Sequence, residues 1–69
     1  MSDSVYKVIE LVGSSDKSWD DAAKVAIEKA SKSLKDLRVA EVVKQDVKLE
    51  NGKITSFRTK LKVSFKYLD

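Results

Sequence analysis

Residues 47–57 read VKLENGKITSF and place the dipeptide Asn51-Gly52 between two segments in which apolar and polar residues alternate. Both central residues of a tight type I′ turn need a positive backbone φ, which Asn and Gly tolerate best. We therefore predict a β-hairpin with Asn51-Gly52 as its turn. The alternation extends from Leu37 to Tyr67 and predicts two long strands on either side of that turn.

A hairpin without a bulge pairs each residue before the turn with its mirror position after it, which fixes the faces of both strands. Phe57 then faces Asp46, and Gln45 faces Arg58. The bulky residues of the last strand share one face, which we expect to pack on a helix: Phe57, Leu61, Val63, Phe65 and Tyr67. On the other face, Val39, Glu41, Val43, Gln45 and Val47 lie opposite Ser64, Lys62, Lys60, Arg58 and Ser56, in that order. Valines mixed with charges in this way predict a subunit interface or a ligand-lined cavity.

Upstream of the hairpin, the sequence predicts one strand and one helix. Residues 5–12 (VYKVIELV) are apolar and β-branched and stop at Gly13, which favours a strand covered on both faces. Ser18 is a good helix N-cap, and acidic residues occupy the first turn after it. Small or apolar residues then recur three or four positions apart, at Trp19, Ala22, Ala23, Ala26, Ala30, Ser33, Leu34 and Leu37. Such a stripe, mostly alanine, lets a sheet approach closely but buries little area.

The predicted order of elements is β-α-β-β, an α+β fold in a single domain over residues 1–69. In an antiparallel sheet the last strand must lie between the other two, because those two run in the same direction. The predicted strand order is therefore 1-3-2. One helix covers one sheet face, and we expect copies of the chain to cover the other.

The composition also points to self-association. A chain of 69 residues buries only about 60% of the surface that it exposes when unfolded. Small folds usually gain support from disulfides, a structural metal or association with copies of themselves. The sequence has no Cys and no His, which excludes disulfides, thiolate or imidazole zinc sites, and catalysis by either residue. We therefore predict a homo-oligomer.

The charge pattern and motifs narrow the function further. Lys and Arg outnumber Asp and Glu by 14 to 11, but the signs are interspersed, so we predict neither nucleic-acid nor membrane binding. No charged-then-apolar leader and no long apolar run is present, which favours a cytoplasmic protein. A catalytic carboxylate pair, a Ser with a base and a Gly-rich phosphate loop are all missing. We expect a binding protein and no enzyme.

Four stretches together resemble the dodecins, small flavin-binding proteins whose β-α-β-β subunits assemble as hollow shells of twelve. They are VYKVIELVGSS at residues 5–15, SWDDAAKVAIEKA at 18–30, LKDLRVAEVV at 34–43 and KLKVSFKYL at 60–68. The resemblance implies a homododecamer that stores or sequesters a flavin, such as riboflavin or FMN, at subunit interfaces without catalysis.

The sequence departs from the dodecin pattern at two positions that hold the flavin. A Trp that stacks on the isoalloxazine ring in many dodecins matches Val39, and a Gln that contacts the polar edge of the ring matches Arg58. Losing the stacking partner forfeits about 0.5 to 1.5 kcal/mol, and Arg cannot accept a hydrogen bond. Gln45, which the predicted register sets across from Arg58, has an amide able to read a ring edge. We predict that Val39, Gln45 and Arg58 line a flavin-type ligand site.

The alternative function is Ca²⁺ binding, or a purely structural shell without flavin. A subset of the family that includes a calcium dodecin shares the Ser-Trp helix start, the Val and the aromatic-Arg pair of this sequence. Carboxylates are available at Asp20, Asp21, Glu41, Asp46 and Glu50, but they form no EF-hand spacing, and the metal ligands stay unknown.

Two residues have a structural interpretation beside the functional one. Arg58 is a candidate ion-pair partner of Glu41 or of an acid in another copy. Trp19 is interpreted as a core or interface anchor, because it begins the helical stripe that should face the aromatic strand.

Overall fold

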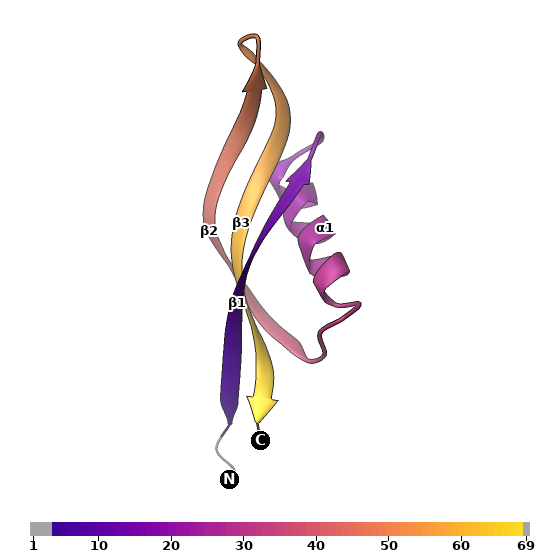
Figure 1. Ribbon diagram of the computed structural model, residues 1–69, viewed down its shortest axis with the longest axis vertical. Coiled ribbons are helices and arrows are strands. Elements are labelled where there is room, and N and C mark those ends of the chain that lie inside the picture. Colours follow the sequence, from indigo (N-terminus) through magenta and orange to yellow (C-terminus); the bar gives the residue numbers. More distant parts are fainter. Residues whose placement is uncertain (1–3, 69) are drawn as a thin grey trace.

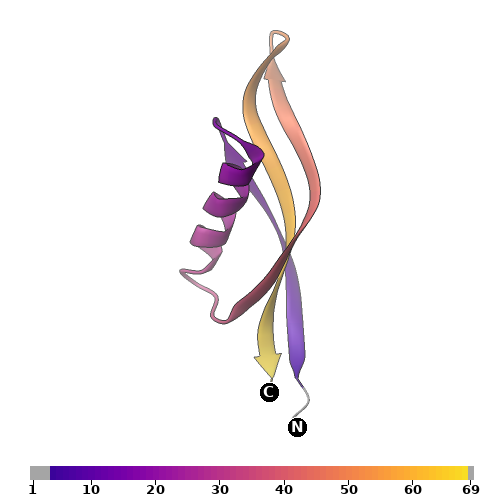
Figure 2. The same cartoon turned by 180° about the vertical axis from the view of Figure 1, so that it is seen from behind.

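The computed structural model describes residues 4–68, and the predicted β-α-β-β order is confirmed. The elements in Figure 1 are β1 (Val5–Ser15), α1 (Trp19–Ala30), β2 (Leu37–Glu50) and β3 (Lys53–Leu68). The strands form one antiparallel sheet in the order β1-β3-β2, as predicted. Figures 1 and 2 show α1 on one side of the sheet, with no element on the other.

Ser18 is the N-cap of α1, as predicted. Its hydroxyl oxygen accepts a 3.0 Å hydrogen bond from the backbone N–H of Asp21, which satisfies one of the free donors of the first turn. Ser15, the last residue of β1, donates a 2.6 Å hydrogen bond to the Asp21 carboxylate. Asp21 therefore ties the end of β1 to the beginning of α1.

The helix ends at Ala30, earlier than the predicted stripe. The backbone N–H groups of Ser33 and Leu34 both bond the Ala30 carbonyl oxygen, at 3.1 and 2.9 Å, so the chain tightens into a turn. Asp36 then takes a left-handed φ of 58° and leads into β2. The prediction that Ser33, Leu34 and Leu37 continue a helical stripe was wrong, because serines in this segment favour turns over helix. Leu37 reaches the same core from β2.

The alanine stripe lets α1 approach β1 closely, as predicted. Ala22, Ala26 and Ala30 are buried. Gly13 stands against them without space for a side chain, because a β-carbon there would collide with the Ala22 carbonyl and lie 3.0 Å from the Ala26 β-carbon. The distance between helix and sheet is therefore set at a residue that has no side chain.

The core is small and lies between α1 and the middle strand. Leu61 and Val63 are buried at its centre, and Thr59 is buried beside them with its hydroxyl donating to the backbone oxygen of Trp19 at 2.9 Å. The half-buried residues packed around the centre are Ile9, Leu11, Ala23, Ile27 and Leu37.

Tyr67 departs from the predicted core. Its side chain is 60% exposed, whereas Phe57 and Phe65 are half-buried as expected of that face. A register irregularity at the start of β1 leaves Tyr67 without a facing residue, and the Lys7 ammonium lies 5.7 Å from its ring centre. The alternation breaks at this irregularity, so Tyr67 does not continue the buried row.

The hairpin turn has the predicted form, with φ of 52° at Asn51 and 75° at Gly52. Glu50 faces Lys53 next to the turn, and Ala40 faces Val63 far from it, both as predicted. The register prediction holds next to the turn and from Val39 to Val42. It fails in the middle of the hairpin and again at the beginning of β2, where Leu37 faces Phe65 and Arg38 has no facing residue.

One unpaired residue in each strand shifts the pairing in the middle. Thr55 has no partner in β2, and Val43 has none in β3. Between them Asp46 faces Arg58, so the predicted pairing of Gln45 with Arg58 was wrong. Bulges increase the twist of a pair of strands, and long strands that curve around a short helix need that twist.

The shifted pairing has two further consequences for the predicted faces. Gln45 faces Thr59, and Val47 faces Phe57, instead of the predicted pairing of Phe57 with Asp46. Facing residues share a side of the sheet, so Gln45 and Val47 belong to the helix side. Their predicted place on the opposite face was wrong.

The single chain is elongated rather than compact. It measures 55 × 20 × 13 Å, with a radius of gyration of 14.4 Å, against about 11 Å for a compact chain of this length. Its accessible surface is 5341 Å², against about 4,300 Å² for a monomeric protein of this mass. The hairpin tip projects past β1 and α1 (Figure 1). Within residues 4–68, no helix combines the length and apolar character needed to cross a membrane.

Candidate functional site

The sheet face turned away from α1, here named the open face, carries the candidate ligand residues. The register aligns its side chains in rows across the three strands: Val8, Ser64 and Val39; Glu10, Lys62 and Glu41; Ser14, Arg58 and Asp46. Strand β3 contributes the polar and basic middle of each row. The outer strands contribute valines and acids, together with Ser14 and, in the row of Lys60, Lys44.

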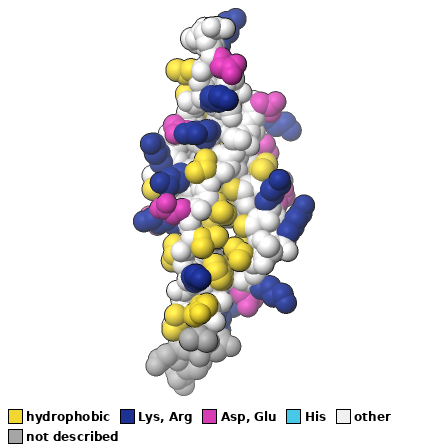
Figure 3. Space-filling view, in the orientation of Figure 1, with side chains coloured by type: hydrophobic (Ala, Val, Ile, Leu, Met, Phe, Trp, Pro, Cys, Tyr) yellow, Lys and Arg dark blue, Asp and Glu magenta, His cyan; other side chains and the backbone are white. Residues whose placement is uncertain are grey.

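Valines of the open face are largely uncovered in the single chain. Val8 and Val12 of β1 are 56% and 59% exposed, and Val39 of β2 is 63% exposed. The prediction that β1 is covered on both faces is therefore wrong for one chain alone, since only its helix side is packed. In Figure 3, hydrophobic side chains gather toward the centre and lower part of one side of the molecule, with Lys and Arg along the margins.

A hollow of about 440 Å³ lies on the open face around Val39. Its lining is Val8, Val39, Glu41, Lys62 and Ser64. This volume is within the range of small-molecule sites, roughly 300 to 1,000 Å³. Two valines offer an apolar wall, and Lys62 is a hydrogen-bond donor. The Ser64 hydroxyl donates to the backbone oxygen of Val39 at 3.4 Å and can still accept a hydrogen bond. Val39, which the sequence resemblance matches to a ring-stacking Trp, is therefore part of a ligand-sized hollow.

Arg58 is bound to a carboxylate of its own chain. Its Nε and Nη2 donate to Oδ1 and Oδ2 of Asp46 at 2.7 and 2.8 Å. These hydrogen bonds, with the charge of Arg58 and then Lys44, hold the pKa of Asp46 below its ordinary value. The same contacts raise the pKa of Arg58. Arg58 therefore forms an ion pair, but the predicted partner was wrong: it is Asp46 of the same chain, and neither Glu41 nor an acid of another copy.

Trp19 supports this pair from the other side of the sheet. Its indole Nε1 donates a 3.0 Å hydrogen bond to the backbone oxygen of Asp46. Its ring meets the ring of Phe57 edge to face, with centres 5.2 Å apart. Trp19 is half-buried between α1 and the shifted stretch of the hairpin, in agreement with its interpretation as an anchor.

The three predicted site residues do not meet within one chain. Val39 and Arg58 share the open face, but Val39 faces Ser64 and Asp46 faces Arg58. A strand advances about 3.3 Å per residue, so Ser64 and Arg58 are about 20 Å apart along β3. Gln45 lies in the helix-side row of Thr59. Sequence reasoning missed Asp46 because a bulge-free hairpin sets it on the wrong face.

A second cation of the open face also has an acidic partner. The Lys60 ammonium lies 3.6 Å from a carboxylate oxygen of Glu10. Glu41 and Lys62 face each other as predicted, but they form no ion pair in the part of the chain that the structure describes. Both border the hollow, so their polar ends are available there.

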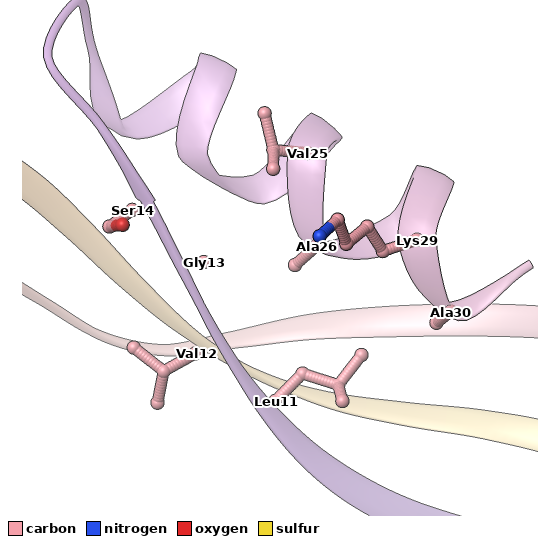
Figure 4. A pocket seen from close by; sticks show the side chains of 8 residues that line it. All are labelled: Leu11, Val12, Gly13, Ser14, Val25, Ala26, Lys29 and Ala30. Atoms are coloured by element: carbon pink, nitrogen blue, oxygen red, sulfur yellow. The ribbon is translucent and has the colours of Figure 1, made fainter.

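A second concave surface lies at the edge of the sheet, between β1 and α1. Figure 4 shows Leu11 and Val12 of β1 on one wall and Val25, Ala26 and Lys29 of α1 on the other. The space is about 440 Å³ and mostly apolar. It adjoins the outer edge of β1, whose backbone has no neighbouring strand in the sheet of residues 4–68. A strand edge beside an apolar groove favours contact with another polypeptide.

The acidic residues form no metal site in a single chain. No group of three or more carboxylates lies close enough together among residues 4–68. Asp46 is engaged by Arg58, and Asp21 by the hydroxyl of Ser15. Calcium usually takes six to eight oxygen ligands, so these residues of one chain do not fit the ion by themselves.

Comparison with known proteins supports the family resemblance. The sequence profile of the family Dodecin matches residues 5–68. The calcium dodecin of Mycobacterium tuberculosis is 52% identical over 64 residues, which cover 91% of this chain and 89% of that protein. A solved structure of calcium dodecin from that organism, a calcium-chelating antigen with a novel calcium-binding site, is 49% identical with a TM-score of 0.84, covering 93% and 91% of the two chains. The dodecin of Streptomyces coelicolor is 32% identical with a TM-score of 0.92, covering 100% and 99%.

Proposed function

Because this chain belongs to the dodecin family, we propose that it is a non-enzymatic binding protein that holds a flavin-type ligand between the copies of a homo-oligomer. The observation that carries the proposal is the open face, where uncovered valines border a ligand-sized hollow. Twelve copies, a single domain over residues 1–69 and a cytoplasmic location stay predictions from the sequence.

Val39 and Arg58 contribute to one ligand only when they come from different copies. About 20 Å along β3 separates their rows, more than a single ring system spans. The open face has no covering layer from residues 4–68, so a second copy can bring its Arg58 toward the first copy's Val39. Association also compensates for the extended shape and the exposed valines of one chain. The contact between Gln45 and the ligand stays a prediction from the sequence. The row of Gln45 lies on the helix side and not on the open face.

The test is a titration of riboflavin at fixed, dilute concentration with the purified protein, followed by fluorescence polarisation. Polarisation is preferred over quenching, because a valine wall lacks the aromatic ring that quenches by stacking. Val39→Trp should tighten binding by about two- to tenfold, the size of a stacking contribution, and should add quenching. Val12→Trp is the control, since Val12 is similarly exposed on the same sheet face but borders the groove between β1 and α1 and not the hollow. Unchanged polarisation with both the wild type and Val39→Trp would refute flavin binding.

Ca²⁺ binding is the second candidate function, favoured by the 52% identity to a calcium dodecin. Since residues 4–68 of one chain bring no three carboxylates together, oxygens from several copies would have to combine. Metal analysis of the purified protein, with a Ca²⁺ titration of its thermal midpoint, tests this function independently of flavin. A stoichiometric metal content and a raised midpoint without flavin binding would favour it.

A further inference from the structure

We propose that Asp46 determines the ligand specificity of Arg58, an inference that rests on the proposed function. Asp46 offsets the charge of Arg58 and orients its guanidinium to donate to a neutral ring edge in preference to an anion. Asp46 acts through Arg58 and is therefore a positioning residue.

The contact geometry leaves a defined set of donors on Arg58. A guanidinium has five N–H groups in a planar fork. Two of them, on Nε and Nη2, point to the two oxygens of Asp46. The remaining N–H of Nη2 and one N–H of Nη1 point in parallel away from Asp46. Such a pair matches two adjacent acceptors, for example a carbonyl oxygen beside a ring nitrogen on a flavin.

Two features hold Asp46 in place beside Arg58. Trp19 fixes its backbone oxygen from the helix side at 3.0 Å. The unpaired residues Thr55 and Val43 shift the register so that its carboxylate stands opposite Arg58. Because the carboxylate accepts two hydrogen bonds from one planar group, it restricts the rotation of the guanidinium. Arg58 is thus oriented before a ligand arrives, which lowers the entropy lost on binding.

The surrounding charges agree with selection for a neutral ligand. Arg58 is offset by Asp46, and Lys60 by Glu10 at 3.6 Å. Lys62 stands in a row between Glu10 and Glu41. In the row beside Arg58, Lys44 faces Lys60 and adds one positive charge, so the acids of the open face offset most but not all of its cations. A phosphate or carboxylate could use the same two free N–H groups of Arg58, but the negative charge of the adjacent Asp46 carboxylate would repel it.

The test compares riboflavin with FMN, which adds a phosphate to the same ring, by fluorescence polarisation. The wild type should bind both with similar affinity and little salt dependence. Asp46→Asn should weaken riboflavin binding by about tenfold, the loss expected when a charge-assisted contact no longer orients a donor, while FMN binding weakens less. Glu10→Gln is the matched control, because it removes one negative charge and one ion pair from the same face without touching Arg58. In ¹H–¹⁵N correlation NMR spectra, the Nε–H proton of Arg58 should exchange slowly with solvent in the wild type and quickly in Asp46→Asn.

The outcomes separate this proposal from the proposed function. If Asp46→Asn and Glu10→Gln change the FMN to riboflavin preference equally, net charge explains the effect and the role of Asp46 is wrong. If neither flavin binds to the wild type, the proposed function fails and the specificity proposal falls with it. If Asp46→Asn does not fold, the exchanged pair Asp46→Arg with Arg58→Asp keeps the ion pair. We expect this double variant to fold and to lose riboflavin binding; retained binding would overturn the proposal.

Discussion

The indole Nε1 of Trp19 donates a 3.0 Å hydrogen bond to the backbone oxygen of Asp46, a residue 27 positions away. The contact joins the first turn of α1 to the stretch of the hairpin in which the register is shifted. The edge-to-face contact with Phe57 and the hydrogen bond from Thr59 to the Trp19 backbone reinforce the same junction. The helix start and the Arg58 site on the opposite side of the sheet are therefore mechanically connected.

Trp19→Phe should lower the free energy of unfolding, because the hydrogen bond to Asp46 is lost while a smaller aromatic ring keeps part of the packing. We expect a loss of about 1 kcal/mol for the variant, and about 3 kcal/mol for Trp19→Ala, which also removes the packing. Urea unfolding followed by circular dichroism, at one fixed protomer concentration, measures both. Equal losses for the two variants would mean that the hydrogen bond, and not the packing, dominates.

Gly13→Ala should disrupt the packing of α1 on β1. Its β-carbon would collide with the Ala22 carbonyl, and backbone cannot move aside cheaply. We expect a loss of about 3 kcal/mol, at the upper end for overpacking. Gly52→Ala is the control, since its site is open and only its positive φ of 75° is strained, with a cost of about 1 kcal/mol. The thermal midpoint of Gly13→Ala should be clearly lower than that of Gly52→Ala. The reverse order would contradict the close approach of α1 to β1.

Ser18→Ala should destabilise the helix start by about 1 kcal/mol, because the Asp21 N–H loses its capping acceptor. Ser31→Ala removes a serine at the other end of α1, where the hydroxyl donates to the carbonyl of Glu28 on an exposed surface. Chemical unfolding should show little change for Ser31→Ala. Similar effects for both serines would argue against a specific capping role of Ser18.

The Arg58–Asp46 pair should make stability depend on acid pH. The pKa of Asp46 is lower in the folded chain than in the unfolded chain, first through its hydrogen bonds to Arg58 and then through the charges of Arg58 and Lys44. A lowered folded pKa gives stability that is present above the unfolded pKa and is lost as the pH falls through the folded pKa. Between about pH 6 and about pH 3, the wild type should therefore lose more stability than Asp46→Asn. Parallel pH profiles of the two unfolding midpoints would refute this contribution.

Dissociation of the oligomer should accompany unfolding. One chain has a radius of gyration of 14.4 Å and a core centred on few residues, so association supplies burial that the chain lacks alone. The thermal midpoint should rise with protomer concentration, as linkage requires when assembly stabilises the fold. Analytical ultracentrifugation beside circular dichroism over a dilution series checks this. A folded monomer at high dilution would contradict it.

Much of the fold could be predicted from local patterns. The dipeptide Asn51-Gly52 specified the hairpin turn, and Ser18 specified the N-cap of α1. The requirement for antiparallel pairing placed β3 between β1 and β2. The end of α1 was less predictable, because Leu34 and Leu37 fit a helical spacing by chance while the chain turns at Ser33. Local periodicity does not show where a helix ends when residues beyond its end pack on the same core from another element.

The candidate site was predicted only in part. The sequence indicated that Val39 and Arg58 lie on one sheet face, because a period of two follows from the pleat itself. It did not show that Asp46 faces Arg58 or that Gln45 lies on the other side. Each bulge adds a single residue, Thr55 or Val43, whose own alternation gives no sign of being unpaired.

The sequence by itself determined the elements, their order and the strand topology, since these follow from short-range patterns. The size of the chain also predicted association with further copies. Only the tertiary structure decided the register in the middle of the hairpin, and with it the partner of Arg58. The reason is physical: curvature of the sheet around α1 is a property of the whole packed unit, and the bulges that permit it shift side chains from one face to the other.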